Sequence, residues 1–477
     1  MNGESDFSLI ALEAAVFLLG IAVLALDMVF RGSRPAIVRR TAITGMALLV
    51  VVSFLSGKSG AGWYGMILVD SASIFFRRIF LVAALFVFIM MSRSRDLGGR
   101  DPAEYYGLAL FATVGMMFTA SAANFMTLFM ALELLTISFY VLVAYNRDEL
   151  LGLEAGVKYL IIGTVSTAFI LLGLAFVYGA TGSLDFGVVA SRLGEAGKTD
   201  PLLLVGAVLM LVGLGFKISA VPFHTWAPDV YQGATTPVVA FLSVGSKAAG
   251  LVLLMRLAFS VFLAIRPEWV LILSVVTVAT MFYGNLGALS QTNIKRLLGY
   301  SGIAQAGYLL MGLVAATVES GSAMLYYLAG YLATNLLAFM VIVVFSRTVK
   351  GHSISSYAGL ARRSPILAAS LLVAMLSLAG VPPLAGFFGK FLLIDAVIKA
   401  GYTWLAVVAA LNVVTALYYY LQVVKTVYVL PPAAETPIEV DTSTKAVLYA
   451  CMLAILVIGV FQEPLYDAVR TAAVTLF

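Results

Sequence analysis

The sequence predicts an all-α polytopic membrane protein with about fourteen transmembrane helices. Of its 477 residues 62% are hydrophobic and only 11% are charged, and the mean hydropathy is +1.03. Soluble globular proteins have roughly 45–50% apolar and about 25% charged residues. The chain therefore has too few polar residues to cover the surface of a water-soluble particle. Its apolar runs also reach the length of about 20 residues that a bilayer-spanning helix requires.

Charged or turn residues bound each apolar run. The first run, 7–30, carries Glu13 and Asp27 and lacks a basic n-region and a cleavage-like site. It is therefore expected to be a retained span and not a signal peptide. In order, the expected spans are 7–30, 36–56, 67–92, 104–122, 124–145, 152–180, 201–222, 234–259, 267–288, 297–317, 321–346, 364–398, 402–430 and 442–462.

Lysine and arginine are unevenly distributed between alternate connections. The odd-numbered connections hold most of them, with clusters at 31–40 and 347–363. Because positive loops stay on the cytoplasmic side, these connections are expected to face the cytoplasm. Both termini are then predicted on the non-cytoplasmic side of the membrane.

Eight basic residues fall inside the expected spans. A charge at mid-bilayer costs at least about 2.5–3.5 kcal/mol, so such residues usually face a bundle interior or water. Arg77 and Arg78 are explained if the third span begins later, and Arg256 and Lys425 lie near span ends, where long side chains can reach the interface. The complete set is Arg77, Arg78, Lys158, Lys217, Lys247, Arg256, Lys390 and Lys425.

Spans 7 and 12 are interrupted by proline, which predicts discontinuous helices. Val-Pro recurs 160 residues apart, at Pro222 and Pro382. This offset predicts two five-helix repeats, which must have opposite membrane orientation because each contains an odd number of helices. Paired broken segments of this kind mark transport sites. The expected units are 1–103 (helices 1–3), 104–263 (repeat 1, helices 4–8), 264–430 (repeat 2, helices 9–13) and 431–477 (helix 14).

Glu133 lies near the middle of span 5 among hydrocarbon side chains, so it needs a partner or a proton. Lys217 and Lys247, each inside a span, are its candidate partners. Burial lowers the pKa of a lysine, whereas a nearby carboxylate raises it. A lysine whose carboxylate partner moves away can therefore load and release a proton. The alternatives are a static ion pair or a neutral acid for Glu133, and helix-end snorkelling for Lys217.

Further polar residues accompany the two broken spans. Lys390 is expected either in the proton path or exposed to water by an unwound 386–389 segment. Lys158 follows Glu154 by four residues, a spacing that fits an interfacial pair as well as a proton relay. His224 is a candidate proton carrier or a hydrogen-bond partner for freed carbonyl groups. The aspartates that follow the two breaks, Asp229 and Asp395, either cap helices or have a functional role. His352 is expected to be a solvated side chain in a basic loop.

Redox cofactors are not expected on this chain. The single cysteine, Cys451, excludes a disulfide framework, an iron–sulfur cluster and a cysteine zinc site. Two histidines leave little for haem ligation, and the sequence contains neither a Walker loop nor a GxGxxG that opens a βαβ unit,. Nothing in it suggests a nucleic-acid partner.

Three motifs carry a resemblance to a known family. They are ELLTISFYVLVAY at 133–145, KISAVPFHTWAPDVYQG at 217–233 and GVPPLAGFFGK at 380–390. They resemble subunit N of bacterial respiratory complex I, the NADH–quinone oxidoreductase, within the wider group of antiporter-like subunits. The resemblance covers nearly the whole chain, and the second motif is highly specific.

The resemblance implies fourteen helices, inverted five-helix repeats, discontinuous helices 7 and 12, and buried charges that move protons. The family's helix-5 glutamate falls on Glu133, and its lysines of helices 7, 8 and 12 fall on Lys217, Lys247 and Lys390. Lysine at 390 fits subunit N better than subunit M. Many relatives carry histidine where this chain has Gln305, which passes a hydrogen bond but does not titrate, so a proton stop at that point is in question.

The function expected from these features is proton translocation in the membrane arm of NADH:quinone oxidoreductase. NADH, FMN, iron–sulfur clusters and quinone would belong to partner subunits of the membrane and peripheral arms. The resemblance also implies that the lipid bilayer around this chain is the bacterial plasma (inner) membrane. One alternative is a subunit of a multi-subunit cation/proton antiporter. Another is a structural spacer, against which charges at mid-membrane argue.

Overall fold

Apolar helices make up nearly all of the structure, because a backbone that crosses lipid must satisfy its hydrogen bonds within its own segment. The computed structural model describes residues 7–30, 35–97, 102–195, 200–349, 351–432 and 436–477. Its longer helices are α2 Ala11–Phe30, α3 Pro35–Leu55, α4 Ser71–Arg93, α5 Ala103–Ser121, α6 Phe125–Val143, α7 Leu150–Thr181, α13 Arg266–Leu289, α14 Ile294–Ala315, α15 Val318–Ser346, α19 Thr403–Tyr428 and α20 Thr442–Val460.

Shorter helices complete the chain. They are α8 Phe186–Glu195, α9 Pro201–Lys217, α10 Trp226–Gly233, α11 Thr236–Phe241, α12 Lys247–Arg256, α16 Leu360–Arg363, α17 Pro365–Ala379, α18 Ala385–Lys399 and α21 Glu463–Val474. A two-stranded antiparallel hairpin, β1 Gly60–Gly62 and β2 Ile67–Val69, pairs Gly60 with Val69 and connects α3 to α4.

The all-helical membrane fold predicted from the sequence is confirmed. Among the described residues eleven helical segments are long and apolar enough to cross a bilayer, and α11, α12 and the π-helical turns beside them form one such segment, Thr236–Val261. Helix α5 and the two pairs α9/α10 and α17/α18 occupy the remaining expected spans. Helices 7 and 12 are therefore broken where the prolines predicted.

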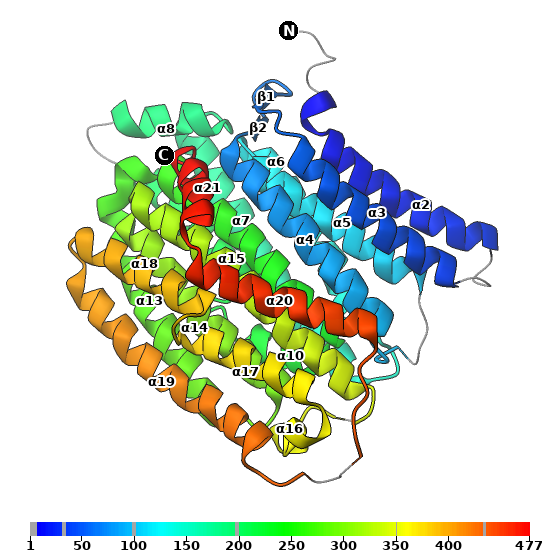
Figure 1. Ribbon diagram of the computed structural model, residues 1–477. Coiled ribbons are helices and arrows are strands. Elements are labelled where there is room, and N and C mark those ends of the chain that lie inside the picture. Colours follow the sequence, from blue (N-terminus) through cyan, green and yellow to red (C-terminus); the bar gives the residue numbers. More distant parts are fainter. Residues whose placement is uncertain (1–6, 31–34, 98–101, 196–199, 350, 433–435) are drawn as a thin grey trace.

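The two halves of the bundle repeat the same neighbours. Helix α5 packs on α6 and α7 packs on α9 and α10, and in the second half α13 packs on α14 and α15 on α17 and α18. Figure 1 shows α20 crossing the bundle beside α17, with α21 at the same end as the start of α2. These recurring pairs support the predicted repeats, whose boundaries stay a prediction.

Two expectations about basic residues are wrong. Helix α4 does begin later than expected, at Ser71, yet Arg77 still lies in its second turn and is buried in an ion pair with Glu13 (2.6 Å). Arg256 does not snorkel: it is 3% exposed and binds Asp70 at 2.9 Å. Snorkelling was inferred from distance to the span end alone, whereas the acid that holds Arg256 is 186 residues away in sequence.

Candidate functional site

The first part of the candidate site contains Glu133 and Lys217, each of which binds a different threonine. Thr136 lies one turn after Glu133 on α6, so both side chains share a face of the helix. The Lys217 ammonium donates a hydrogen bond to the Thr136 hydroxyl, and the Thr167 hydroxyl of α7 donates to Glu133 Oε1 at 2.8 Å. Lys217 is 2% exposed, so helix-end snorkelling is excluded, whereas Glu133 is only partly buried.

The predicted direct pairing of Glu133 with a lysine is therefore absent from the described residues. No ion pair joins Glu133 to Lys217 or Lys247, although the carboxylate acts electrostatically on Lys217. Thr136, which sequence reasoning missed, is the group in contact with Lys217. Hydroxyl groups at a helix interior are too common in membrane helices to have indicated this contact.

The break in helix 7 lies directly after Lys217. Helix α9 ends at this residue and α10 starts at Trp226, and between them Ser219 has a positive φ of 62°. The indole of Trp226 donates to the carbonyl of Phe216 at 3.1 Å, an oxygen that also accepts from the amide of Ser219 at 3.0 Å within the break. His224 lies in the break as expected, 5% exposed, with its ring 4.0 Å from that of Tyr283.

Lys247 lies next to this break on the following helix. A π-helical turn, Leu242–Ser246, precedes it, a feature often found at functional sites,. Gly250 lets this helix approach closely: a Cβ there would lie 2.9 Å from the Cβ of Lys217. The Lys247 ammonium is buried and donates to the carbonyl of Gly302 on α14 at 2.7 Å.

Gln305 and Lys390 meet at one backbone carbonyl. Gln305 Nε2 donates to the carbonyl of Leu378 at 3.2 Å, and Lys390 Nζ donates to the same oxygen at 2.7 Å and to that of Ala379 at 3.3 Å. These carbonyls belong to the last turn of α17, where the break in helix 12 leaves acceptors unused. Gly380 ends this helix with φ +87°, a conformation that glycine adopts without strain,.

The expected unwinding at 386–389 is wrong. This stretch is helical and belongs to α18, while the interruption lies between Ala379 and Ala385. Gly386 allows α18 to press against the end of α17, since a Cβ there would lie 1.9 Å from the carbonyl oxygen of Ser377. Lys390 is consequently 4% exposed and not open to water.

A small cavity links the two halves of the site. It measures about 10 Å³, and its lining includes Lys247, Gly302, Gln305 and Tyr331. A cavity of roughly 10–15 Å³ holds about one water molecule when polar partners surround it. The ammonium of Lys247 and the amide of Gln305 thus border one space of molecular size.

Buried hydroxyl and amide groups surround Gln305. The Tyr327 hydroxyl donates to its Oε1, and its Nε2 lies 3.3 Å from the hydroxyl of Tyr420, which in turn pairs with Ser301. Sequence reasoning singled out Gln305 but missed these partners. Tyrosine is common throughout this chain, so composition gave no signal for them.

Lys158 lies apart from the buried lysines. Its ammonium contacts Glu154 at 2.7 Å and Asp229 at 2.6 Å, and Asp229 also binds Arg296 at 2.6 Å. Its side chain is 41% exposed, which fits the interfacial pair. Asp229 thus belongs to an ion-pair cluster at the first turn of α10, whereas Asp395 forms an exposed i,i+4 pair with Lys399.

His352 is not simply solvated, contrary to expectation. It is partly buried in the connection after α15, and its Nδ1 is shielded from solvent. Burial, together with the nearby charge of Lys295, lowers the pKa of His352 to about 4,. The ring is thus neutral at physiological pH.

Comparison with known proteins gives the family. The model for NADH:quinone oxidoreductase/Mrp antiporter transmembrane subunits matches residues 122–416. The chain is 41% identical to NADH-quinone oxidoreductase subunit N of Desulforamulus reducens, covering 98% of each chain, and 39% identical to that of Moorella thermoacetica, covering 99% of each. The chain belongs to the subunit N family of NADH-quinone oxidoreductases.

Solved structures agree with this family. A chain of respiratory complex I from Thermus thermophilus with bound aureothin superposes with a TM-score of 0.83 at 34% identity, covering 96% of this chain and 99% of that one. A chain of the Mrp complex from Dietzia sp. reaches 0.85 at 20% identity, covering 98% and 97%, a likeness that shows the shared fold. Membership in the subunit N family confirms the resemblance carried by the three motifs.

Proposed function

We propose that this subunit N family member translocates protons in the membrane arm of a complex I-type NADH:quinone oxidoreductase. The observation that best supports this function is a series of three buried lysines, Lys217, Lys247 and Lys390. Ionisable groups inside a membrane bundle are costly and mark ion pathways. Each of the three lies in a different helix of the two repeats and contacts an oxygen acceptor.

The contacts suggest how a proton moves along this series. An ammonium group donates hydrogen bonds whether or not a carboxylate is near, and the hydroxyl and carbonyl acceptors here carry no charge. No described carboxylate forms an ion pair with Lys247 or Lys390, so loss of a proton leaves no buried anion behind. The cavity bordered by Lys247 and Gln305 has room for about one water, which would accept the proton that Lys247 releases,.

Gln305 would orient the hydrogen-bonding groups around it and would not hold a proton. Its amide accepts from Tyr327 and donates toward Leu378 O, the oxygen that also accepts from Lys390. A glutamine neither gains nor loses a proton near neutral pH, so it can only orient its neighbours. In the proposed route, the lysines are therefore the groups that gain and lose protons, and the negative charge of Glu133 acts electrostatically on Lys217.

The redox chemistry would lie in partner subunits. Among the described residues no group of three or more His, Cys, Asp or Glu side chains is placed to hold a metal ion. In this proposal NADH, FMN, iron–sulfur clusters and quinone bind elsewhere in the complex, and quinone reduction shifts the position of Glu133 relative to Lys217. Both termini of this chain would face the non-cytoplasmic side of the plasma membrane.

The test is proton translocation by the intact complex in sealed vesicles. Native gels stained for NADH dehydrogenase activity first establish that the chain migrates with the active complex. Lys217→Ala, Lys247→Ala and Lys390→Ala are expected to lower the protons moved per NADH oxidised, while Lys425→Ala, at an exposed position late in α19, serves as the matched control. Unchanged pumping in assembled Lys217→Ala complexes would refute the proposed role of this residue.

The alternative expected from the sequence is a subunit of a cation/proton antiporter. The Mrp chain shares the fold at 20% identity, whereas the 41% identity to subunit N favours the complex I interpretation over this alternative. The antiporter alternative predicts transport that depends on sodium and a chain that migrates in an assembly without NADH dehydrogenase activity. Sodium-independent pumping coupled to NADH oxidation would exclude this candidate.

A further inference from the structure

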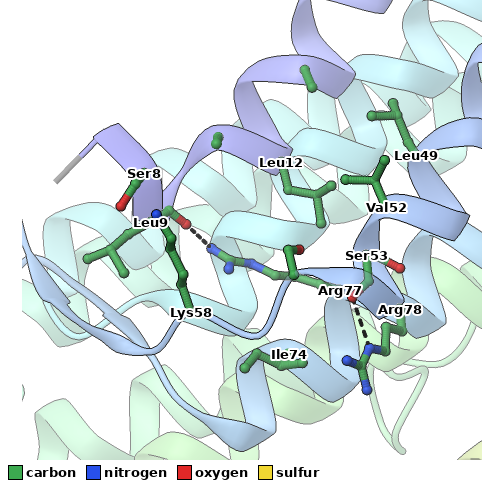
Figure 2. A pocket seen from close by; sticks show the side chains of 13 residues that line it. Ser8, Leu9, Leu12, Leu49, Val52, Ser53, Lys58, Ile74, Arg77 and Arg78 are labelled. Carbon is green, nitrogen blue, oxygen red and sulfur yellow. Dashed lines mark hydrogen bonds between the residues drawn. The ribbon is translucent and has the colours of Figure 1, made fainter. Parts of the chain in front are cut away.

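A cavity of about 140 Å³ lies where α3 ends and where α2 and α4 begin, far in sequence from the proton route. Figure 2 shows three basic side chains around it: Lys58 from the connection after α3, and Arg77 and Arg78 from α4. By the same measure a single water needs roughly 10–15 Å³. The cavity therefore has room for a group of several atoms.

The three cations are not equally compensated. Arg77 pairs with Glu13 at 2.6 Å and donates to the carbonyl of Leu9, so its charge is neutralised. Arg78 donates only to the carbonyl of Ser53 at 3.3 Å and lies 4.8 Å from the ring of Phe54. Neither Arg78 nor Lys58 has an acidic partner among the residues that the structure describes. Counted over the described residues alone, the lining of the cavity thus has two positive charges without an acidic partner.

The surroundings place its mouth at the membrane surface. Apolar residues of α3 nearby are open to the outside, with Leu48 63% and Phe54 59% exposed. Trp63 and Tyr64 form the tip of the hairpin that follows α3, and Tyr64 is fully open. Exposed aliphatic side chains beside Trp and Tyr are typical of the boundary between hydrocarbon and headgroups.

We propose that this cavity binds the phosphodiester headgroup of an anionic phospholipid. Lys58 and Arg78 would contact the phosphate oxygens, because ammonium and guanidinium groups form charge-assisted hydrogen bonds with phosphate. Leu12, Leu49 and Val52 line the same cavity and would contact the first carbons of an acyl chain. This mixed lining favours a lipid over free phosphate, which has no apolar part to bury.

The test uses the intact complex in nanodiscs of phosphatidylcholine that contain a phosphatidylglycerol with a photoreactive group beside its phosphate. After illumination, labelled peptides are identified by mass spectrometry. Labelling is expected in the peptides that contain Lys58 and Arg78. Excess unlabelled phosphatidylglycerol should reduce it, whereas excess phosphatidylcholine or inorganic phosphate should not.

The second part of the test removes the charges of Lys58 and Arg78. Basic residues near a membrane surface contribute about a fivefold gain in affinity each toward anionic lipid. Lys58→Gln combined with Arg78→Gln should therefore reduce labelling at this site about 25-fold, while Lys58→Arg with Arg78→Lys should retain most of it. Lys425→Gln, distant in sequence, is the control.

Several results would overturn the proposal. Labelling confined to other helices, equal competition by phosphatidylcholine, or equal labelling of the double glutamine variant would each exclude an anionic-lipid site here. Displacement by inorganic phosphate would assign the cavity to a soluble anion. If the double variant does not assemble, the competition experiment on the unmodified complex decides alone.

Discussion

Replacing Gly302 by alanine tests the link between Lys247 and the second half of the bundle. A Cβ at position 302 would lie 2.6 Å from Lys247 Nζ, and ordinary contact begins at 3.4 Å. The ammonium must therefore retreat by about 0.8 Å, which lengthens its 2.7 Å bond to the Gly302 carbonyl. The Tyr331 hydroxyl, 3.3 Å from the same Cβ, limits the directions in which it can move.

Gly302→Ala should affect the stability of the helix and the rate of proton transfer in opposite directions. Alanine inside a helix is favoured over glycine by roughly 0.5–1 kcal/mol, and the atom that must move is the flexible end of a lysine. We therefore expect the complex to assemble normally. A misplacement of about 1 Å in a reacting group can cost roughly 100-fold in rate, so proton transfer through Lys247 should slow by about 10- to 100-fold.

The assay is NADH-driven acidification of sealed vesicles, normalised to NADH oxidation. Lys247→Ala sets the level expected for complete loss at this position. Gly57→Ala is the matched control, since a Cβ there has nothing within 4 Å. Assembled Gly302→Ala complexes that pump like the unmodified protein would show that the Lys247–Gly302 contact is not on the route.

Three more predictions follow from individual contacts. Thr136→Val removes the acceptor of Lys217 and should lower pumping per NADH, because a hydrogen bond to a charged group contributes about 1.5–3 kcal/mol; Thr136→Ser retains the hydroxyl, and equal pumping by the two variants would contradict this reasoning. Arg256→Met leaves the largely buried Asp70 carboxylate without its ion pair and should destabilise the fold by about 3–5 kcal/mol, measured as a lower melting temperature,. Asp70→Asn in the same chain should partly restore the melting temperature, because it removes the charge and keeps an oxygen that can cap α4; no shift in melting temperature would count against the pair. The pKa of His352 is lowered to about 4 from an ordinary 6.5, so on acidification this histidine is protonated in the unfolded chain before it is protonated in the folded one,. The contribution of His352 to stability is therefore complete above about pH 6.5 and falls as the pH drops toward 4,. The melting temperature of His352→Asn should fall less over this interval, and an equal fall in both proteins would refute the assignment.

The course of the helices could be predicted because it depends on local pattern. Apolar length fixed the spans, and the prolines at 222 and 382 marked both breaks. The lysines at 217, 247 and 390 were identifiable because a cation inside an apolar run is conspicuous in any sequence.

Their partners could not be predicted in the same way. Lys247 and Lys390 bind the carbonyls of Gly302 and Leu378, and a backbone acceptor leaves no trace in residue type. The pairing of Arg256 with Asp70 likewise depends on how distant helices pack. Glu133 was expected near Lys217, and its charge does act on that lysine. The contact between Thr136 and Lys217, however, depends on the rotation of α6 about its axis.

Contacts made by the C-terminal residues can form only after the rest of the chain has been synthesised. The amide of Ala72, at the start of α4, donates to the hydroxyl of Thr475, and the Ser260 hydroxyl donates to the carbonyl of Leu476. Helices α20 and α21 also pack along α15. Helix α4 therefore lacks its contact with Thr475 until about four hundred further residues have left the ribosome. Quality control that acts on incompletely packed helices could therefore act on this chain until Thr475 and Leu476 have been synthesised.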